Sequence, residues 1–313
     1  MTNVERLHVI FTIDCQPAAD KTAPEGPKSW EQSARAIDGF CSVVHDSGYP
    51  VTLFLTPKCA DMHGPLVDEL LGIGMELGLY VQPQSLAGGH YKHFLGQYDA
   101  ATQREIVMLA MQQFRDTVGL RPQSVRSAMF SASDETFGTL YSLGFRQGSL
   151  SSPGRRVSKH GAVWTGAARD AHYVRPDSRL EAGELPFFEV PVTTDADQEH
   201  GGLAPDLMVE HGSFESWQRP LIDGQVRRLE TAGVPFKTLC IVTRNCFAYH
   251  NRKDKARVTL DALLAHLETL EEARNGHAGF ELYPTTLAHA HHLYRSPASV
   301  HSSFHDMPEN GKP

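Results

Sequence analysis

An aspartate at the end of a long apolar run is the most informative feature of this sequence. Residues 7–13 (LHVIFTI) are rich in β-branched and aromatic side chains, and Asp14 follows them directly. Such a run is typical of a buried parallel strand. Ligands bind at the carboxyl ends of strands in α/β proteins, so Asp14 is a candidate catalytic acid or base. The alternative is an aspartate that only caps the turn after the strand.

Two histidines three residues apart form a second candidate cluster. His90 and His93 lie in a polar stretch, and on a helix their spacing would place both side chains on one face. They could hold a metal or act as an acid–base pair, and the alternative is a pair of solvent-exposed side chains. The histidines at 289–292 are interpreted as a solvated helix face. Cys15 would be a nucleophile only if a histidine reached it, and otherwise packs in the core.

Composition narrows the class of protein. The 313 residues carry a formal charge of −8, and no run of lysines and arginines indicates a nucleic-acid surface. No apolar stretch approaches the roughly 18 residues that span a bilayer. The polar start MTNVER resembles no signal peptide, and five cysteines without CxxC spacing fit reduced thiols. We therefore expect a cytoplasmic protein without nucleic-acid or membrane partners, and a homo-oligomer is left open.

Strand and helix patterns alternate along the chain and predict what positions these residues. Strands are expected at 7–13, 51–56, 75–81, 124–126, 145–149, 189–192, 238–243 and 280–282. Helices are expected at 29–45, 65–71, 100–117, 133–143, 217–232, 257–275 and from about 283 to 294. Residues 151–184 are expected to form an extended loop. We expect one domain over residues 1–294 and a disordered polar tail over 295–313.

The number of βα units decides the fold class. About seven such units, with no GxGxxG after the first strand, favour a distorted (β/α) barrel over an open Rossmann sheet. The order of elements resembles the NodB-type polysaccharide deacetylases over roughly residues 7–293. The resemblance is carried by four motifs, at residues 12–16 (TIDCQ), 74–80 (GMELGLY), 126–130 (RSAMF) with 143–145 (LGF), and 241–245 (IVTRN). It implies a barrel of this type and hydrolysis of an amide bond.

The family's metal ligands are replaced in this chain. In the family, an aspartate or glutamate and two histidines hold a metal that polarises the amide carbonyl and activates a water. Those positions fall here on Cys15 or Gln16, on Tyr80, and on Gln82 or Gln84. Neutral amides and a phenol are poor ligands for a transition metal. We therefore expect no metal in the family's position and no cofactor, with a zinc site formed by His90 and His93 as the alternative.

The residues that the chain retains are expected to carry the chemistry. The resemblance implies that Asp14 is the general base and that Arg126 pairs with it and depresses its pKa. Arg244 stands where the family has its acid histidine and could stabilise an oxyanion, as could Tyr80. His90 or His93 would protonate the leaving nitrogen. The structural alternatives are a helix cap for Arg126 and an ion pair for Arg244. We assign substrate contacts to Gln16, Gln82, Phe130 and Asn245.

Two classes of function follow. The first is a metal-independent hydrolase of the C–N bond of a small amide or imide, or of an N-acetylated sugar, because some relatives of this fold open cyclic amides without a metal. The second is a non-catalytic homologue that binds a carbohydrate or another small ligand in the barrel mouth. A metal-dependent N-deacetylase using His90 and His93 is a further alternative. In the first reading, Asp14, Tyr80, Arg126 and Arg244 surround one pocket.

Overall fold

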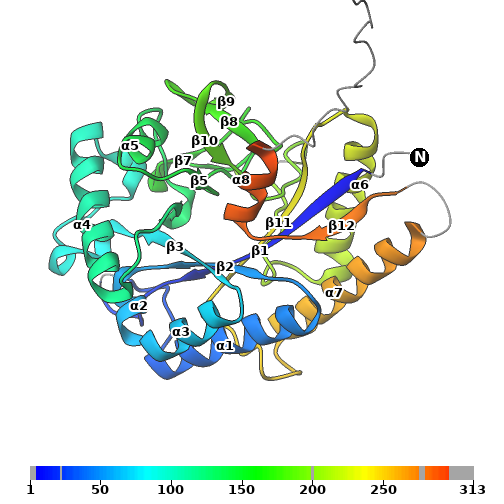
Figure 1. Ribbon diagram of the computed structural model, residues 1–313, viewed down its shortest axis with the longest axis horizontal. Helices are drawn as coiled ribbons and strands as arrows, with labels where there is room; N and C mark the ends of the chain where they lie inside the picture. The colour runs from blue at the N-terminus through cyan, green and yellow to red at the C-terminus, as the bar shows by residue number, and fades with distance from the viewer. Residues whose placement is uncertain (1–4, 22, 199–200, 275–278, 296–313) are drawn as a thin grey trace, which may run out of the picture.

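The computed structural model describes residues 5–21, 23–198, 201–274 and 279–295. They form a distorted (β/α) barrel in which a ten-stranded sheet is surrounded by helices (Figure 1). The expected fold class is confirmed. None of the helices described combines the length and the hydropathy needed to cross a bilayer.

Seven strands line the barrel and run parallel to their neighbours. In spatial order they are β11 (Lys237–Arg244), β1 (Arg6–Cys15), β2 (Val51–Leu55), β3 (Glu76–Val81), β4 (Ser124–Ser127), β5 (Gln147–Gly148) and β10 (Leu185–Glu189). Just beyond β10, the backbone N–H of Thr193 donates to the carbonyl oxygen of Cys240 on β11 at 3.2 Å. The Cys240 N–H donates back to Thr193 Oγ1 at 2.9 Å. These two bonds join the ends of the strand order.

Three further strands extend the sheet outside this ring. β12 (Glu281–Pro284) pairs with the first half of β1, and β8 (His172–Arg175) and β9 (Ser178–Ala182) add antiparallel strands beyond β10. The helices are α1 (Trp30–Asp46), α2 (Pro57–Met62), α3 (Gly64–Gly72), α4 (Ala100–Val118), α5 (Thr136–Ser142), α6 (Arg219–Thr231), α7 (Lys255–Arg274) and α8 (Leu287–Arg295).

Alternate residues of β1 face two different cores. Phe11, Ile13 and Cys15 belong to the apolar core between the sheet and the surrounding helices. Ile10 belongs to the smaller core inside the barrel. Since strand side chains alternate between faces, Asp14 shares the inner face with Ile10. The inner face of the strand therefore carries His8, Ile10 and Thr12 before the charged Asp14 near its end.

Helix α8 covers the end of the barrel opposite to that charge. Its Leu287 N–H donates to Thr52 Oγ1 at 3.1 Å, and its Ala288 N–H donates to Glu76 Oε2 at 2.9 Å. Thr52 and Glu76 lie at the starts of β2 and β3. The amino-terminal ends of β2 and β3 are thus capped by a helix, which leaves the opposite, carboxyl ends of the strands open, where α/β proteins place their chemistry.

Several expected elements differ from the structure. Residues 151–184 are not a plain loop, because they contain the hairpin of β6 (Arg156–Val157) and β7 (Ala162–Val163) as well as β8 and β9. The strand expected at 189–192 ends instead at Glu189, and α2 was missed. These strands are short and are stabilised by distant partners, which leaves little local periodicity to detect. The expected tail lies outside the described residues from 296 onward.

A close approach at Gly148 on β5 provides a test of the barrel. A Cβ there would lie 2.4 Å from Leu150 Cδ1 and 2.8 Å from Phe187 Cζ. We predict that Gly148→Ala destabilises the protein by about 1–3 kcal/mol through overpacking. Gly224→Ala is the control, since it is helical with nothing within 4 Å and should stabilise by about 0.5–1 kcal/mol. Urea unfolding measures both, and equal effects would contradict the packing described.

Candidate active site at the barrel mouth

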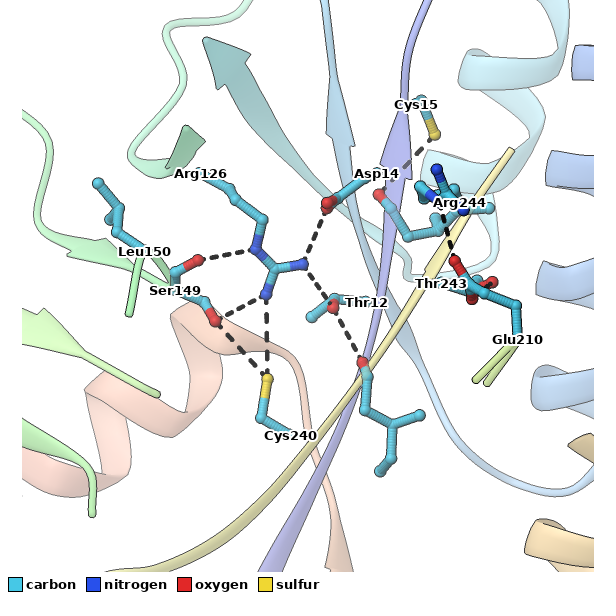
Figure 2. Close-up of polar contacts among 12 residues, drawn as sticks. Thr12, Asp14, Cys15, Arg126, Ser149, Leu150, Glu210, Cys240, Thr243 and Arg244 are labelled. Carbon is cyan, nitrogen blue, oxygen red and sulfur yellow. Dashed lines mark hydrogen bonds and ion pairs between the residues drawn. The ribbon is translucent and has the colours of Figure 1, made fainter. Parts of the chain in front are cut away.

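A buried ion pair joins the ends of β1 and β4. Arg126 Nη1 lies 2.9 Å from Asp14 Oδ1, and both side chains are almost completely buried (Figure 2). The expected pairing of these two residues is confirmed. Their strands are not neighbours, since β2 and β3 lie between them in the sheet. The guanidinium therefore reaches across the inside of the barrel to the carboxylate.

Every N–H group of Arg126 has a partner within the barrel. Nη1 also donates to Thr12 Oγ1 at 2.8 Å. Nε donates to the Ser149 carbonyl oxygen at 2.7 Å, and Nη2 donates to Ser149 Oγ at 2.6 Å with a weaker contact to Cys240 Sγ at 4.0 Å. The planar cation lies 4.5 Å from the ring centroid of Phe54. Arg126 is thus held by hydrogen bonds at its edges and by an aromatic ring on its face.

Burial changes the acidity of Asp14 in the direction opposite to the one expected. Loss of water around the carboxylate raises the pKa of Asp14 above its ordinary value, and this outweighs the charge and hydrogen bond of Arg126, which lower it. The expectation of a depressed pKa is therefore wrong. It considered the charged partner and omitted the desolvation that comes with placing both groups inside the barrel.

A cavity of about 280 Å³ opens at the carboxyl ends of the strands. Of the residues expected in the site, Gln16, Tyr80 and Gln82 line it. Asp14 lies two residues before Gln16, and its charge is close enough to Tyr80 to affect that residue's pKa. Arg126 is fully buried and is not part of the wall. Of the four residues expected around one pocket, only Tyr80 lines the cavity, and the Asp14–Arg126 pair lies behind its wall.

Tyr80 presents a neutral hydroxyl at this position. Burial, together with the charge of Asp14, raises the pKa of Tyr80 well above its ordinary value. A phenol that remains protonated can donate a hydrogen bond to a developing oxyanion. Next to it, Met129 and Phe130 have φ values of +58° and +59°, conformations that cost energy for residues other than glycine. Met129 lines the cavity, so this strained turn shapes the wall.

Arg244 at the end of β11 is held by a carboxylate. Its Nε lies 2.8 Å from Glu210 Oε1, and Glu210 also accepts from Thr243 Oγ1 at 3.0 Å (Figure 2). The side chain is about a quarter exposed and does not line the cavity. The structure therefore contains the ion pair that was the structural alternative for Arg244. Its charge still acts on both Asp14 and Tyr80.

Two of the residues assigned to substrate contacts bind other parts of the protein and do not line the cavity. Asn245 is fully buried, and its side chain accepts from the Gln16 N–H at 3.0 Å while donating to the Gln16 carbonyl oxygen at 2.9 Å and to Ser33 Oγ at 2.8 Å. It fixes the backbone of Gln16 rather than facing the cavity. The ring of Phe130 lies 5.6 Å from the Arg126 guanidinium, and the residue does not line the cavity.

The histidine pair lies outside the cavity wall. His90 and His93 are exposed, and residues 91–94 are not helical, so the expectation of a shared helical face is wrong. The ring of His90 contacts Tyr91, and that of His93 contacts Tyr98. Gly88 and Gly89 have positive φ values just before this segment and direct the chain into turns.

The donors at the family's metal position do not fit a transition metal. Cys15 faces the helix side of the sheet, and burial raises the pKa of its thiol well above the ordinary value, which opposes the thiolate that a metal needs. Tyr80 also remains protonated, and Gln16, Gln82 and Gln84 supply only neutral amides. Among the residues described, no three His, Cys, Asp or Glu side chains are grouped as a metal site.

Several residues near the cavity were missed from the sequence. Lys21, Gln84, Lys92 and His160 line it, and Asp206 pairs with His211 at 2.7 Å beside the Glu210–Arg244 pair. All lie in loops, single 3-10 turns or an isolated bridge, whose positions depend on tertiary contacts rather than on periodicity. Gln84 had a signal in the sequence, because it occupies one of the positions considered for the second metal histidine.

The fold is similar to several solved structures. Two are described as polysaccharide deacetylases. The one from Mycobacterium smegmatis has 13% identity, a TM-score of 0.61, and coverage of 95% of this chain and 92% of that chain. The one from Pseudomonas aeruginosa PAO1 has 14% identity, a TM-score of 0.60, and coverage of 94% and 92%. Puue allantoinase has 14% identity, a TM-score of 0.59, and coverage of 95% and 93%.

Comparison of the sequence alone finds no match. No family model matches the chain, and no curated protein is detectably similar in sequence. The similar solved structures show that the chain has the NodB-type deacetylase fold. The resemblance seen in its motifs is thus confirmed at the level of the fold. Identities of 13–14% carry no residue roles with them.

The buried ion pair provides a second test. Removing one partner leaves an uncompensated buried charge or its unpaired donors, so we predict that Asp14→Asn and Arg126→Met each cost about 3–5 kcal/mol. The double variant should cost clearly less than the sum, because the two residues act together. Urea unfolding of the three variants measures this. Asp61→Asn, which breaks an exposed pair with Lys58, should leave stability nearly unchanged. Additive losses in the double variant would contradict a coupled pair.

Proposed function

We propose that this chain is a hydrolase that cleaves a non-peptide C–N bond of a small amide or imide, or of an N-acetylated sugar, without the family's metal. The observation that carries the proposal is the buried Asp14–Arg126 pair directly behind the wall of a polar cavity at the carboxyl ends of the strands. Carboxyl groups whose acidity is shifted by burial next to a specific charge are concentrated at catalytic sites.

In the proposed reaction, Asp14 acts as the general base. Its carboxylate takes a proton from a water, and the water oxygen bonds to the carbonyl carbon of the substrate. Tyr80 donates a hydrogen bond to the oxygen that becomes negative, and the positive charge of Arg244 supports it. The C–N bond then breaks, and the proton held by Asp14 passes to the leaving nitrogen. The raised pKa of Asp14 suits both its uptake of a proton from the water and its transfer of that proton to the leaving nitrogen.

One observation favours a second candidate function. Asp14 does not itself line the cavity, so a non-catalytic homologue that binds a carbohydrate or another small ligand there is the competing proposal. The metal-dependent reading with His90 and His93 has less support, because these side chains are exposed and away from the wall. We further propose a cytoplasmic protein with a small-molecule or saccharide partner and without nucleic-acid or membrane partners.

Turnover by variants separates these functions. On a panel of cyclic imides, hydantoins, simple amides and chitin oligomers, we predict hydrolysis of the imides first and weak or no release of acetate from chitin oligomers. Asp14→Asn should lower kcat by about 10²–10⁴-fold, and Tyr80→Phe by about 10²-fold or more. Asp116→Asn, on the outer face of α4, is the control for charge removal and should remain active.

Chelation and folding controls complete this experiment. Activity should survive treatment with a chelator, since none of the steps above uses a metal. Circular dichroism checks that the variants are folded, and Tyr80→Phe remains informative if Asp14→Asn unfolds. Unchanged turnover in both variants would remove these residues from the mechanism. Loss of activity on chelation with recovery on adding zinc would instead support His90 and His93.

The pH profile tests the acidity of Asp14. The base must be deprotonated, so kcat/KM should rise with pH through the pKa of Asp14 in the free enzyme. Because burial raises that pKa above its ordinary value, the rise should fall at a higher pH than for an exposed aspartate, whose pKa is about 3.9. A rate profile measured at constant ionic strength checks this. A limb at or below the ordinary carboxyl range would contradict the raised pKa.

A further inference from the structure

Two arginines are buried among the described residues, and they differ in how they are paired. The five N–H groups of Arg126 all face protein partners. Arg155 is 9% exposed, yet its guanidinium has no hydrogen bond and no ion pair with any residue described. Its Nε is buried without a partner. A buried cation in this state is costly unless something else supplies the missing acceptors.

Arg155 does not itself line the cavity, and the surrounding structure holds it behind the wall. Its guanidinium lies 5.4 Å from the ring centroid of Phe130, the residue after the wall residue Met129. The Arg155 carbonyl accepts from the Trp164 N–H at 2.7 Å, and the Trp164 indole N–H donates to the Phe130 carbonyl oxygen at 2.8 Å. The cation also acts electrostatically on Tyr80, which lines the cavity.

The carboxylate that acts electrostatically on Arg155 already has another partner. Asp206 acts on Arg155 electrostatically, but its Oδ1 lies 2.7 Å from His211 Nδ1. Among the residues described, the carboxylate of Asp206 is paired with His211 and forms no ion pair with Arg155. Arg155 therefore has an incomplete counter-charge and free donors.

Other polar atoms on the same wall also lack partners. Gln82 Oε1, Gln84 Oε1 and His160 Nδ1 are buried and make no hydrogen bond in the structure. All three residues line the cavity. Buried polar groups are normally paired, so a group of orphans around one cavity indicates a polar occupant. The amides can each offer a donor or an acceptor, which suits the two sides of an amide or ureide.

The charges around the cavity indicate whether its ligand is charged, and with which sign. Lys21 and Lys92 line the cavity, and Arg155 lies behind it, in a protein whose formal charge is −8. Glu25 supplies the carboxylate on the wall. Its Oε2 lies 3.9 Å from Arg244 Nη1, so Arg244 partly balances its charge. A neutral sugar would leave Arg155 without a counter-charge. A carboxylate would supply one in the fork geometry that guanidinium groups favour.

We propose that the cavity binds a small anionic amide whose carboxylate extends past the wall to Arg155, while Gln82 and Gln84 hydrogen-bond the amide group. Arg155 is then a specificity-determining residue that selects charged over neutral ligands. As far as this ligand is the substrate, the inference rests on the proposed hydrolase function, and it narrows the substrate class to carboxylate-bearing amides and ureides.

A pair of probes that differ in charge tests the inference without turnover. N-acetylglycine carries a carboxylate, and N-acetylglycinamide replaces it with a neutral amide of similar size. Calorimetry at neutral pH and fixed ionic strength should show that the wild type binds N-acetylglycine at least about tenfold more tightly. Arg155→Met should remove this preference, and Arg155→Lys should restore part of it, since lysine keeps the charge but loses the fork. Arg115→Met, on the exposed face of α4, should leave it intact.

Folding and function have separate readouts in this design. Arg155→Met should not lower the melting temperature, because it removes an unpaired buried charge. Equal binding of the two probes by the wild type, no saturable binding of N-acetylglycine, or a preference that survives in Arg155→Met would overturn the inference. A wild type that prefers the anionic probe but hydrolyses nothing on the panel would remove only the hydrolase proposal.

Discussion

The barrel is organised around one buried cation. Arg126 spans the interior from β4 and must find acceptors there, because a desolvated guanidinium without partners costs several kcal/mol. Its partners come from three places far apart in the sequence, namely Thr12 and Asp14 on β1, Ser149 after β5, and Cys240 on β11. Each contact fixes the position of one barrel segment relative to β4. The ion pair thus sets the geometry of the mouth, while the burial of Asp14 that comes with it raises the pKa of that carboxyl group.

Long elements and their order could be predicted from the sequence, because their signals are local. The apolar run of β1 and the patterns of α1, α4 and α7 each span many residues, so the barrel class followed from their alternation. The hairpins within residues 151–184 could not be predicted in the same way. Their strands are two to five residues long and depend on partners that local pattern does not show.

The candidate site could be predicted only in part, for a related reason. Sequence position placed Asp14 and Arg126 at strand ends, and their pairing followed from the resemblance. The direction of the Asp14 pKa shift could not be predicted. It depends on whether the loss of water around the carboxylate, which raises the pKa, outweighs the charge and hydrogen bond of Arg126, which lower it. Asn245 stands next to Arg244 in the sequence, yet it is used to fix the backbone of Gln16. Arg155 gave no signal, because it lies in the excursion that was expected to be a loop.

The absence of a metal from the proposed mechanism constrains what chemistry this barrel can support. A carboxylate is a far weaker base than the hydroxide that a metal generates, so water attack on an ordinary acetamide would be slow. Two features compensate for this in the proposed mechanism. A base whose pKa is raised by burial abstracts a proton more effectively, and a substrate with a good leaving nitrogen, such as an imide or ureide, lowers the barrier itself. A carboxylate held by Arg155 would add binding energy remote from the reacting bond, which can be used to position the carbonyl group against Tyr80.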